Sequence, residues 1–313
     1  MSHDTSFGVR RLFIIMFLLY HECMKFKIKL ALLIVLFLGS IVSLYALFKE
    51  ARSNILTVTF LNIGQGDAVF IEAPSGNQML IDSGPGRSIL RELSKVMPFY
   101  DRSIDVVLAT HPDADHIGGL PDVLGRYKID WFVESGVESD TGLYQELESR
   151  IMNYELSNKT KKILARRGMV VDLGGGAILQ ILFPDRDPRG METNTASIVA
   201  RLVYGESEFL LTGDSPINIE SYLVSLDCLK CPLALHSDVL KAGHHGSKTS
   251  TSQRFVSLVS PQYVVISAGK DNKYGHPHQE VLDTLKMAGI QILRTDLEGR
   301  VMFETDGLKL KIK

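Results

Sequence analysis

Two histidines and two aspartates within six consecutive positions constrain this chain more than any other feature. They are His111, Asp113, Asp115 and His116, and they directly follow the apolar run 105–109, which is typical of a buried strand. A loop at a strand end follows no regular period, so four such side chains can turn toward one point. Imidazoles and carboxylates are suitable ligands for Zn²⁺, Mn²⁺ or Fe²⁺. Because clustered acids are costly without a compensating cation, we predict a metal site rather than a polar turn with incidental histidines.

The remainder of the chain after residue 54 alternates short apolar runs with helical stretches. This alternation predicts an α/β or α+β sandwich in one continuous domain. Turn signals lie at 64–67 and 82–86. Helical spacing covers 88–96, 143–167 and 279–287, and strand-like runs cover 56–63, 68–73, 78–81, 105–109, 178–183, 197–203, 208–212, 239–241 and 262–267.

An apolar run without a charge extends over the nineteen residues 30–48. This is about the length that crosses the hydrocarbon core of a bilayer. Three lysines, at 25, 27 and 29, precede the run and favour a cytoplasmic N-terminus. We therefore predict a single-pass membrane anchor over residues 26–48 and an extracytoplasmic domain over residues 54–313. A cleaved signal peptide is the alternative, although its apolar region is usually shorter.

The segment before the anchor and the charge of the domain add two further predictions. Met24 is followed by alternating lysines and is a better translation start than Met1, so residues 1–23 are predicted to be a non-structural extension. The chain has 34 basic and 36 acidic residues, of which seven and three precede residue 54, so the domain has a formal net charge of −6. An acidic domain is not a general binder of nucleic acid, and any such contact would come from a local patch.

Seven sequence blocks follow one another in a specific order. They are 61–68, 80–84, His111-Pro112-Asp113-Ala114-Asp115-His116, 194–199, 210–214, 240–247 and 274–278. In this order they resemble the metallo-β-lactamase superfamily, whose signature H-x-H-x-D-H is matched with aspartate at the second position, and in detail the C-terminal hydrolase domain of the ComEC competence family. The resemblance implies a four-layer αββα sandwich with the metals at the edge between its two sheets.

Carried over residue by residue, the resemblance implies two divalent ions, Zn²⁺ or Mn²⁺, bridged by Asp214. The ligands of the first ion would be His111, Asp113 and Asp214. The ligands of the second would be Asp115, His116, Asp214 and one of the pair His244/His245, for which we favour His245. Asp113 and Asn194 stand where many members of the superfamily have histidines. The first site is therefore rich in oxygen, which favours Mn²⁺ over Zn²⁺.

Catalysis and substrate binding are assigned to the remaining motif residues. Metal-bound water that loses its proton near neutral pH would attack the electrophilic centre. Asp82 would orient a ligand histidine, with a turn-capping aspartate as its alternative. The predicted catalytic residues are Asp82, Asp115, His244 and His276, and the predicted substrate-binding residues are Asn194, Ser247, Lys248 and His278. For His278 a solvated loop histidine is an equal alternative.

The predicted function is that of a metal-dependent phosphodiesterase or nuclease, since the resemblance is to a hydrolase domain associated with DNA uptake. One alternative is an esterase for an envelope phosphodiester, such as a phosphorylcholine or teichoic-acid ester. The other is a non-catalytic accessory subunit of a DNA-uptake or envelope assembly, against which the nearly complete ligand motifs argue.

Outside these motifs, Cys228 and Cys231 are predicted to form a disulfide or remain thiols rather than bind zinc. The basic run within 159–167 is predicted to be a solvated helix face, with contact to a phosphate backbone as the alternative.

Overall fold

The computed structural model describes residues 16, 21, 24–44, 54–157, 159–227 and 235–313, and the chain divides into two units, Met1–Arg52 and Ser53–Lys313. Cys228 and Cys231, most of the predicted extension 1–23 and the last residues of the predicted anchor lie outside the described residues. In the first unit, Met24–Leu44 form a helix with a mean hydropathy of 2.2. This helix is long and apolar enough to cross a membrane.

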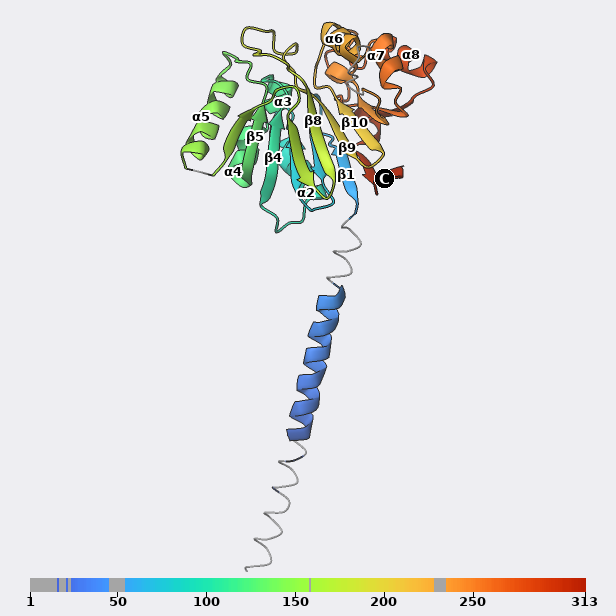
Figure 1. Cartoon of the computed structure of the whole chain (residues 1–313). Helices are drawn as coiled ribbons and strands as arrows, with labels where there is room; N and C mark the ends of the chain where they lie inside the picture. Colours follow the sequence, from blue (N-terminus) through green and yellow to red (C-terminus); the bar gives the residue numbers. More distant parts are fainter. Residues whose placement is uncertain (1–15, 17–20, 22–23, 45–53, 158, 228–234) are drawn as a thin grey trace, which may run out of the picture. The chain divides into compact units, whose positions relative to one another are not determined.

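Two mixed β-sheets lie face to face in the second unit (Figure 1). Among the described residues, the first sheet has the strand order β15-β14-β1-β2-β3-β4-β5-β6 and the second has the order β13-β12-β11-β10-β9-β8-β7. The strands of the first sheet are β1 (Leu56–Phe60), β2 (Val69–Glu72), β3 (Gln78–Ile81), β4 (Ser103–Ala109), β5 (Lys128–Glu134), β6 (Lys161–Leu164), β14 (Val301–Thr305) and β15 (Leu310–Ile312). Those of the second are β7 (Val170–Gly174), β8 (Ala177–Phe183), β9 (Val199–Tyr204), β10 (Ser207–Leu211), β11 (Val239–Lys241), β12 (Tyr263–Ile266) and β13 (Gln291–Arg294).

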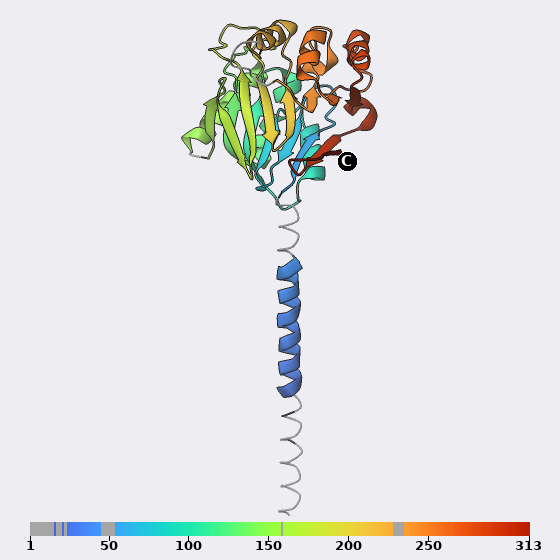
Figure 2. The ribbon, with the colours of Figure 1, turned by 45° about the vertical axis from the view of Figure 1, so that its right-hand side comes forward.

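Helices cover the outer faces of both sheets, as Figure 2 shows from a second direction. On the first sheet lie α2 (Ser88–Val96), α4 (Leu120–Arg126) and α5 (Gly142–Leu156), which bury Leu93, Val123 and Ile151 against it. On the second lie α6 (Ile217–Asp227), α7 (Gln253–Val259) and α8 (Gln279–Met287). The short elements are α3 (Ala114–Ile117), α9 (Thr295–Glu298) and the 3₁₀ turn η1 (Gly243–Gly246). The predicted α/β sandwich is confirmed.

The main core lies between the two sheets, where aromatic rings from both meet. Phe303 on β14 contacts Phe60 on β1 and Phe209 on β10, with ring centroids 6.2 and 5.8 Å apart and edges toward faces. This geometry is the preferred one for aromatic pairs. The central strands are covered on both faces, by the other sheet and by helices, and therefore read in the sequence as nearly continuous apolar runs.

The prediction that 143–167 is mostly helical is right for its first part and wrong for its end. The helix expected over 143–167 ends at Leu156, and Lys161–Leu164 instead form β6, which pairs in parallel with β5. Backbone pairing at the edge of the sheet outweighs the helical pattern of the sequence here. The basic run is consequently no helix face, because Lys161 and Lys162 lie on a strand. The Lys162 ammonium contacts Glu134 at 2.9 Å and Glu148 at 2.6 Å.

The strand directions bring distant loops to one edge of the sandwich. β3, β4 and β5 run in parallel in the first sheet, and β10, β11, β12 and β13 run in parallel in the second. The carboxyl ends of parallel strands meet at the same sheet edge. The loops after β3, β4, β10 and β11 carry the residues described next.

Candidate metal centre

The loop after β4 places two buried imidazoles side by side. The ring centroids of His111 and His116 lie 4.0 Å apart, and both side chains are buried. Asp113 is extended and precedes α3, whose single turn carries Asp115 and His116. A short turn after an extended residue thus aims side chains from consecutive positions toward the interior.

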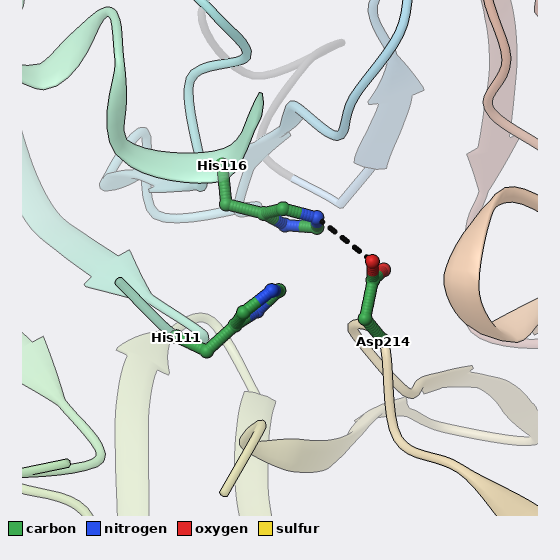
Figure 3. A group of neighbouring side chains, drawn as sticks. All are labelled: His111, His116 and Asp214. Carbon is green, nitrogen blue, oxygen red and sulfur yellow. Dashed lines mark ion pairs between the residues drawn. The ribbon is translucent and has the colours of Figure 1, made fainter. Parts of the chain in front are cut away.

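Asp214, at the end of β10, faces these histidines from the other sheet (Figure 3). Its Oδ2 lies 3.3 Å from Nε2 of His116, and its backbone amide donates to Ser197 Oγ at 3.2 Å. His111, His116 and Asp214 each offer one ligand atom, and these atoms lie within 4.8 Å of one another. The three side chains therefore form one candidate ligand set.

The turn η1 supplies a third histidine. His244 and His245 have left-handed backbone conformations, with φ of 48° and 55°. Nδ1 of His245 donates to the Ser267 carbonyl at 3.0 Å, which leaves Nε2 facing Asp115 Oδ2 at 3.2 Å and Asp214 Oδ2 at 3.4 Å. His244 is partly exposed, and its Nε2 lies 3.7 Å from Asp214 Oδ2. The geometry thus favours His245 as ligand, in a second set with Asp115 and His116.

Asp82 lies beneath the ligand loop and accepts three hydrogen bonds. The donors are the amide of Thr110 at 2.8 Å, its hydroxyl at 2.7 Å and Nδ1 of His116 at 2.8 Å. The bond to Nδ1 fixes the tautomer of His116 and points Nε2 toward Asp214, which is what an orienting carboxylate does for a ligand histidine. The backbone of Asp82 is itself left-handed, with φ of 57°.

Asp82→Asn should weaken metal binding by about 10- to 100-fold, because an amide does not hold the His116 imidazole as a carboxylate does. Competition against a chromophoric chelator measures this affinity. Asp122→Asn is a matched control, since Asp122 pairs at the surface with Arg87. An unchanged affinity in Asp82→Asn would identify Asp82 as a turn-capping residue only.

Two buried charges at this site were not predicted from the sequence, Asp67 and Lys241. Asp67 lies in the loop between β1 and β2, and Lys241 is the last residue of β11. The Lys241 ammonium pairs with Asp67, donates to the Gly213 carbonyl at 3.1 Å and lies 3.7 Å from Asp214 Oδ1. In the sequence, Lys241 could have been recognised as a lysine at the end of an apolar strand. Asp67 could have been recognised as an aspartate that follows a Gly-x-Gly turn. Gly66 (φ 125°) is required because a Cβ there would overlap the Asp115 carbonyl.

Burial and neighbouring charges lower the pKa of His111 and raise the pKa values of His116 and His245. Burial, reinforced by His116, lowers the pKa of His111 to about 3, so its imidazole is neutral. Burial opposes charge on His116 and His245 as well, but Asp214 and Asp82 raise the pKa of His116 well above its usual value. Asp214 and Asp67 likewise raise the pKa of His245 to about 9. Protons on these two imidazoles balance the acids, and a bound cation would displace them.

The buried donor atoms fit a divalent metal. Within the part of the chain that the structure describes, the buried atoms without a hydrogen-bond partner include Nε2 of His111, Nε2 of His116, Oδ1 of Asp67 and Oδ1 of Asp214. Buried polar atoms are rarely left unpaired unless an ion or water serves them. Imidazole nitrogens with carboxylate oxygens suit Zn²⁺ and Mn²⁺.

Asp113 lies further from the centre than the other predicted ligands. Its side chain is 38% exposed, and Oδ2 is 3.7 Å from Nε2 of His111. It belongs to none of the close ligand groups among the described residues. Burial raises its pKa, whereas Asp115 and Asp214 keep lowered pKa values. Its assignment as ligand stays a prediction that needs a side-chain movement toward the ion.

The predicted substrate-binding residues and the nearby histidines differ in their exposure and in their contacts around the centre. Asn194 and His244 line an open hollow of about 520 Å³ beside it, and Oδ1 of Asn194 is buried without a partner. His276 lies 5.5 Å from His244 between ring centroids. Lys248 is exposed, and its amide donates to Nδ1 of His278 at 3.1 Å, so His278 holds this loop. Ser247 is buried, with its hydroxyl 3.0 Å from that of Thr249.

Comparisons with known proteins agree with this architecture. Residues 61–270 match the family model described as the metallo-beta-lactamase superfamily. ComE operon protein 3 of Bacillus subtilis is 31% identical over 271 residues, which cover 79% of this chain and 32% of the relative. Competence protein ComA of Neisseria gonorrhoeae is 30% identical over 259 residues, which cover 82% of this chain and 33% of the relative. The chain thus spans about a third of the length of these relatives.

Among solved structures, CmlA, a diiron beta-hydroxylase from Streptomyces venezuelae, aligns with a TM-score of 0.51 at 16% identity. The alignment covers 79% of this chain and 53% of that chain, and at this identity it shows the fold alone. The resemblance seen in the sequence motifs is confirmed by the family model and by the competence relatives. The chain belongs to the metallo-β-lactamase superfamily.

Proposed function

We propose that residues 54–313 hydrolyse phosphodiester bonds with DNA as substrate, using two divalent ions, Zn²⁺ or Mn²⁺. The observation that carries this proposal is the position of Asp214, whose Oδ2 lies 3.3 Å from Nε2 of His116 and 3.4 Å from Nε2 of His245. Asp214 lies close to both imidazoles and would therefore belong to the ligand sets of both ions. His111, Asp113 and Asp214 would hold one ion, and Asp115, His116, His245 and Asp214 would hold the other.

The charge of the site supports two ions rather than none. Three carboxylates are buried there, two more lie beside them, of which that of Asp113 is the more exposed, and Lys241 is the buried ammonium at the site. With neutral histidines these groups carry four negative charges, which two divalent ions balance. The carboxylates concerned are those of Asp67, Asp82, Asp113, Asp115 and Asp214.

Bound divalent ions would activate water and neutralise charge that develops on the phosphate. The chain's own residues would bind and orient the diester beside them. Burial, reinforced by His245, lowers the pKa of His276 to about 4, and burial also lowers that of His244. Both imidazoles are therefore neutral at pH 7 in the free protein, and an anionic phosphate between them would favour their protonated forms. Protonation of the leaving oxygen by one of them would then become feasible.

DNA is favoured over other diesters because one of the relatives is named as a competence protein. The hollow beside the centre is open, and the exposed Lys248 near it offers an ammonium to a phosphate. We also propose that Met24–Leu44 anchors the chain in a membrane, with the catalytic domain extracytoplasmic. The lysines at the start of this helix support that orientation.

Residues 54–313 are suited to a direct test because all three apolar cores lie within them. The fragment is stripped of metal, reloaded with Mn²⁺ or Zn²⁺, and assayed on single-stranded DNA, double-stranded DNA and bis(p-nitrophenyl) phosphate. We expect metal-dependent cleavage of DNA. Turnover of the small diester without DNA cleavage would favour an envelope phosphodiester as substrate. A folded, metal-loaded fragment that hydrolyses neither would contradict the hydrolase and favour an accessory subunit.

A further inference from the structure

Exposed apolar and basic side chains gather at the end of the sandwich opposite the metal centre. β4 runs for seven residues, about 20 Å, from Ser103 to the ligand loop. β5 and β6 run in parallel with it, so the starts of all three strands lie away from the metals. β1 leads toward Asp67, and Leu56 pairs with Thr305, so Asn54 and the β14–β15 turn also lie there. We call this region the distal end, made up of residues 54–55, 97–103, 125–128, 156–161 without 158, 286–287 and 306–309.

Exposed apolar side chains concentrate at the distal end. Among the described residues of the second unit, the five most exposed large apolar side chains all belong to it. They are Phe99 (85%), Leu156 (78%), Met287 (77%), Tyr100 (74%) and Leu308 (71%). At the metal end the most exposed are Leu297 (69%) and Tyr274 (53%). Single exposed apolar residues are ordinary, but five at one end of a domain, on the ends of α5 and α8 and on two loops, favour a contact surface there.

Basic residues lie among these apolar side chains, although the domain as a whole is acidic. Exposed cations precede or begin three neighbouring strands, with Arg102 at β4, Arg126 and Lys128 at β5, and Lys159 and Lys161 at β6. In the part of the chain that the structure describes, Lys128 is the one of these five cations in an ion pair, with Asp130 at 2.6 Å.

A hollow of about 400 Å³ opens where α4 leads into β5, beside the end of α5. Its lining includes Arg126, Lys128 and Lys159, together with Tyr127 and Tyr154. Cations beside aromatic rings suit the phosphate and glycerol of a lipid headgroup. Basic side chains are attracted to the negative surface potential of an anionic membrane.

The sequence gives a reason to expect a membrane at this end. Asn54 belongs to the distal end, and only residues 45–53 separate it from the helix Met24–Leu44. A linker of this length reaches at most about 35 Å even when fully extended. If the helix spans a bilayer, as proposed above, the distal end is the part of the domain tethered closest to the headgroups. Exposed aromatic and basic side chains are typical of that interface.

We propose that the distal end lies against the anionic headgroups of the membrane, so that the metal centre opens away from the bilayer. Phe99, Tyr100 and Leu308 would enter the interface, and the basic residues at the starts of β4, β5 and β6 would contact lipid phosphates. This inference depends on the proposed anchor and is independent of the hydrolytic activity.

The chain contains a single tryptophan, Trp131, which makes a fluorescence test possible. Full-length chains carrying Trp131→Phe with either Phe99→Trp or Tyr274→Trp are placed in nanodiscs containing phosphatidylglycerol and bromine-labelled lipid. We expect the indole at position 99 to be quenched and blue-shifted relative to nanodiscs without bromine, and the indole at position 274 to be unaffected. Tyr274 is the matched position because it is an exposed aromatic residue at the metal end.

Equal quenching at both positions, or none at position 99, would overturn the proposed orientation. Replacing phosphatidylglycerol by phosphatidylcholine should reduce the quenching at position 99, because the attraction of the cations is electrostatic. Quenching at position 99 that is equally strong in phosphatidylcholine would overturn the role of the basic residues. Failure of the chain to enter nanodiscs at all would contradict the anchor instead. An inactive hydrolase would leave every one of these results unchanged.

Discussion

The double variant Asp115→Asn/His116→Ala should hydrolyse phosphodiesters at least about 10³-fold more slowly than the parent domain. The two residues belong to the same close ligand group, and His116 also faces Asp214. In the proposed two-ion centre their loss would remove one ion, together with the several kcal/mol of charge stabilisation that such an ion would provide in the transition state. Initial rates on bis(p-nitrophenyl) phosphate at saturating Mn²⁺ measure the loss, and elemental analysis of the purified protein measures the bound metal.

Asp140→Asn/His236→Ala is a matched control, because it makes the same chemical changes at two exposed residues away from the ligand loops. This control should retain both the metal content and the rate of the parent. A double ligand variant that keeps full activity would show that the reaction takes place elsewhere on the chain. One that keeps two ions and loses activity would assign Asp115 and His116 to substrate contact instead.

Lys241→Met should lower the free energy of unfolding of the metal-free domain by about 3–5 kcal/mol. Removing one partner of a buried pair leaves an uncompensated charge, and here both Asp67 and Asp214 lose the ammonium that faces them. The variant also leaves the Gly213 carbonyl without its donor. Urea unfolding followed by circular dichroism gives the difference. Bound metal should reduce it, because the cation takes over part of the neutralisation.

Two further variants separate charge from packing at Lys241. Lys128→Met removes an exposed lysine that pairs with Asp130 at the surface, and should cost less than about 1 kcal/mol. Adding Asp67→Asn to Lys241→Met should recover part of the lost stability, since the unpaired carboxylate is then neutral. A loss in Lys241→Met no larger than in Lys128→Met would mean that the buried ion pair contributes little.

Much of the candidate site was predictable because three of its candidate ligands are local in sequence. His111, Asp115 and His116 lie on one loop after a buried strand, and the structure keeps them together in the centre. Asp214 and the choice of His245 came from the order of family motifs rather than from periodicity. Asp67 and Lys241 were missed because neither stands in a ligand pattern. Each becomes recognisable only when the two sheets bring them into contact.

The sequence alone determined the apolar runs, the turns and the ligand types of this chain, because these depend on neighbouring residues. The tertiary structure decided the rest, because contacts between distant residues depend on how the sheets stack. His245 meets Asp115 across 130 positions, once its left-handed turn and the Ser267 carbonyl have fixed its ring. Likewise, β6 replaced the expected helix because β5 offered it an edge to pair with. The free energies of long-range backbone pairing and of charge burial depend on contacts between distant residues, so a local sequence pattern does not indicate them.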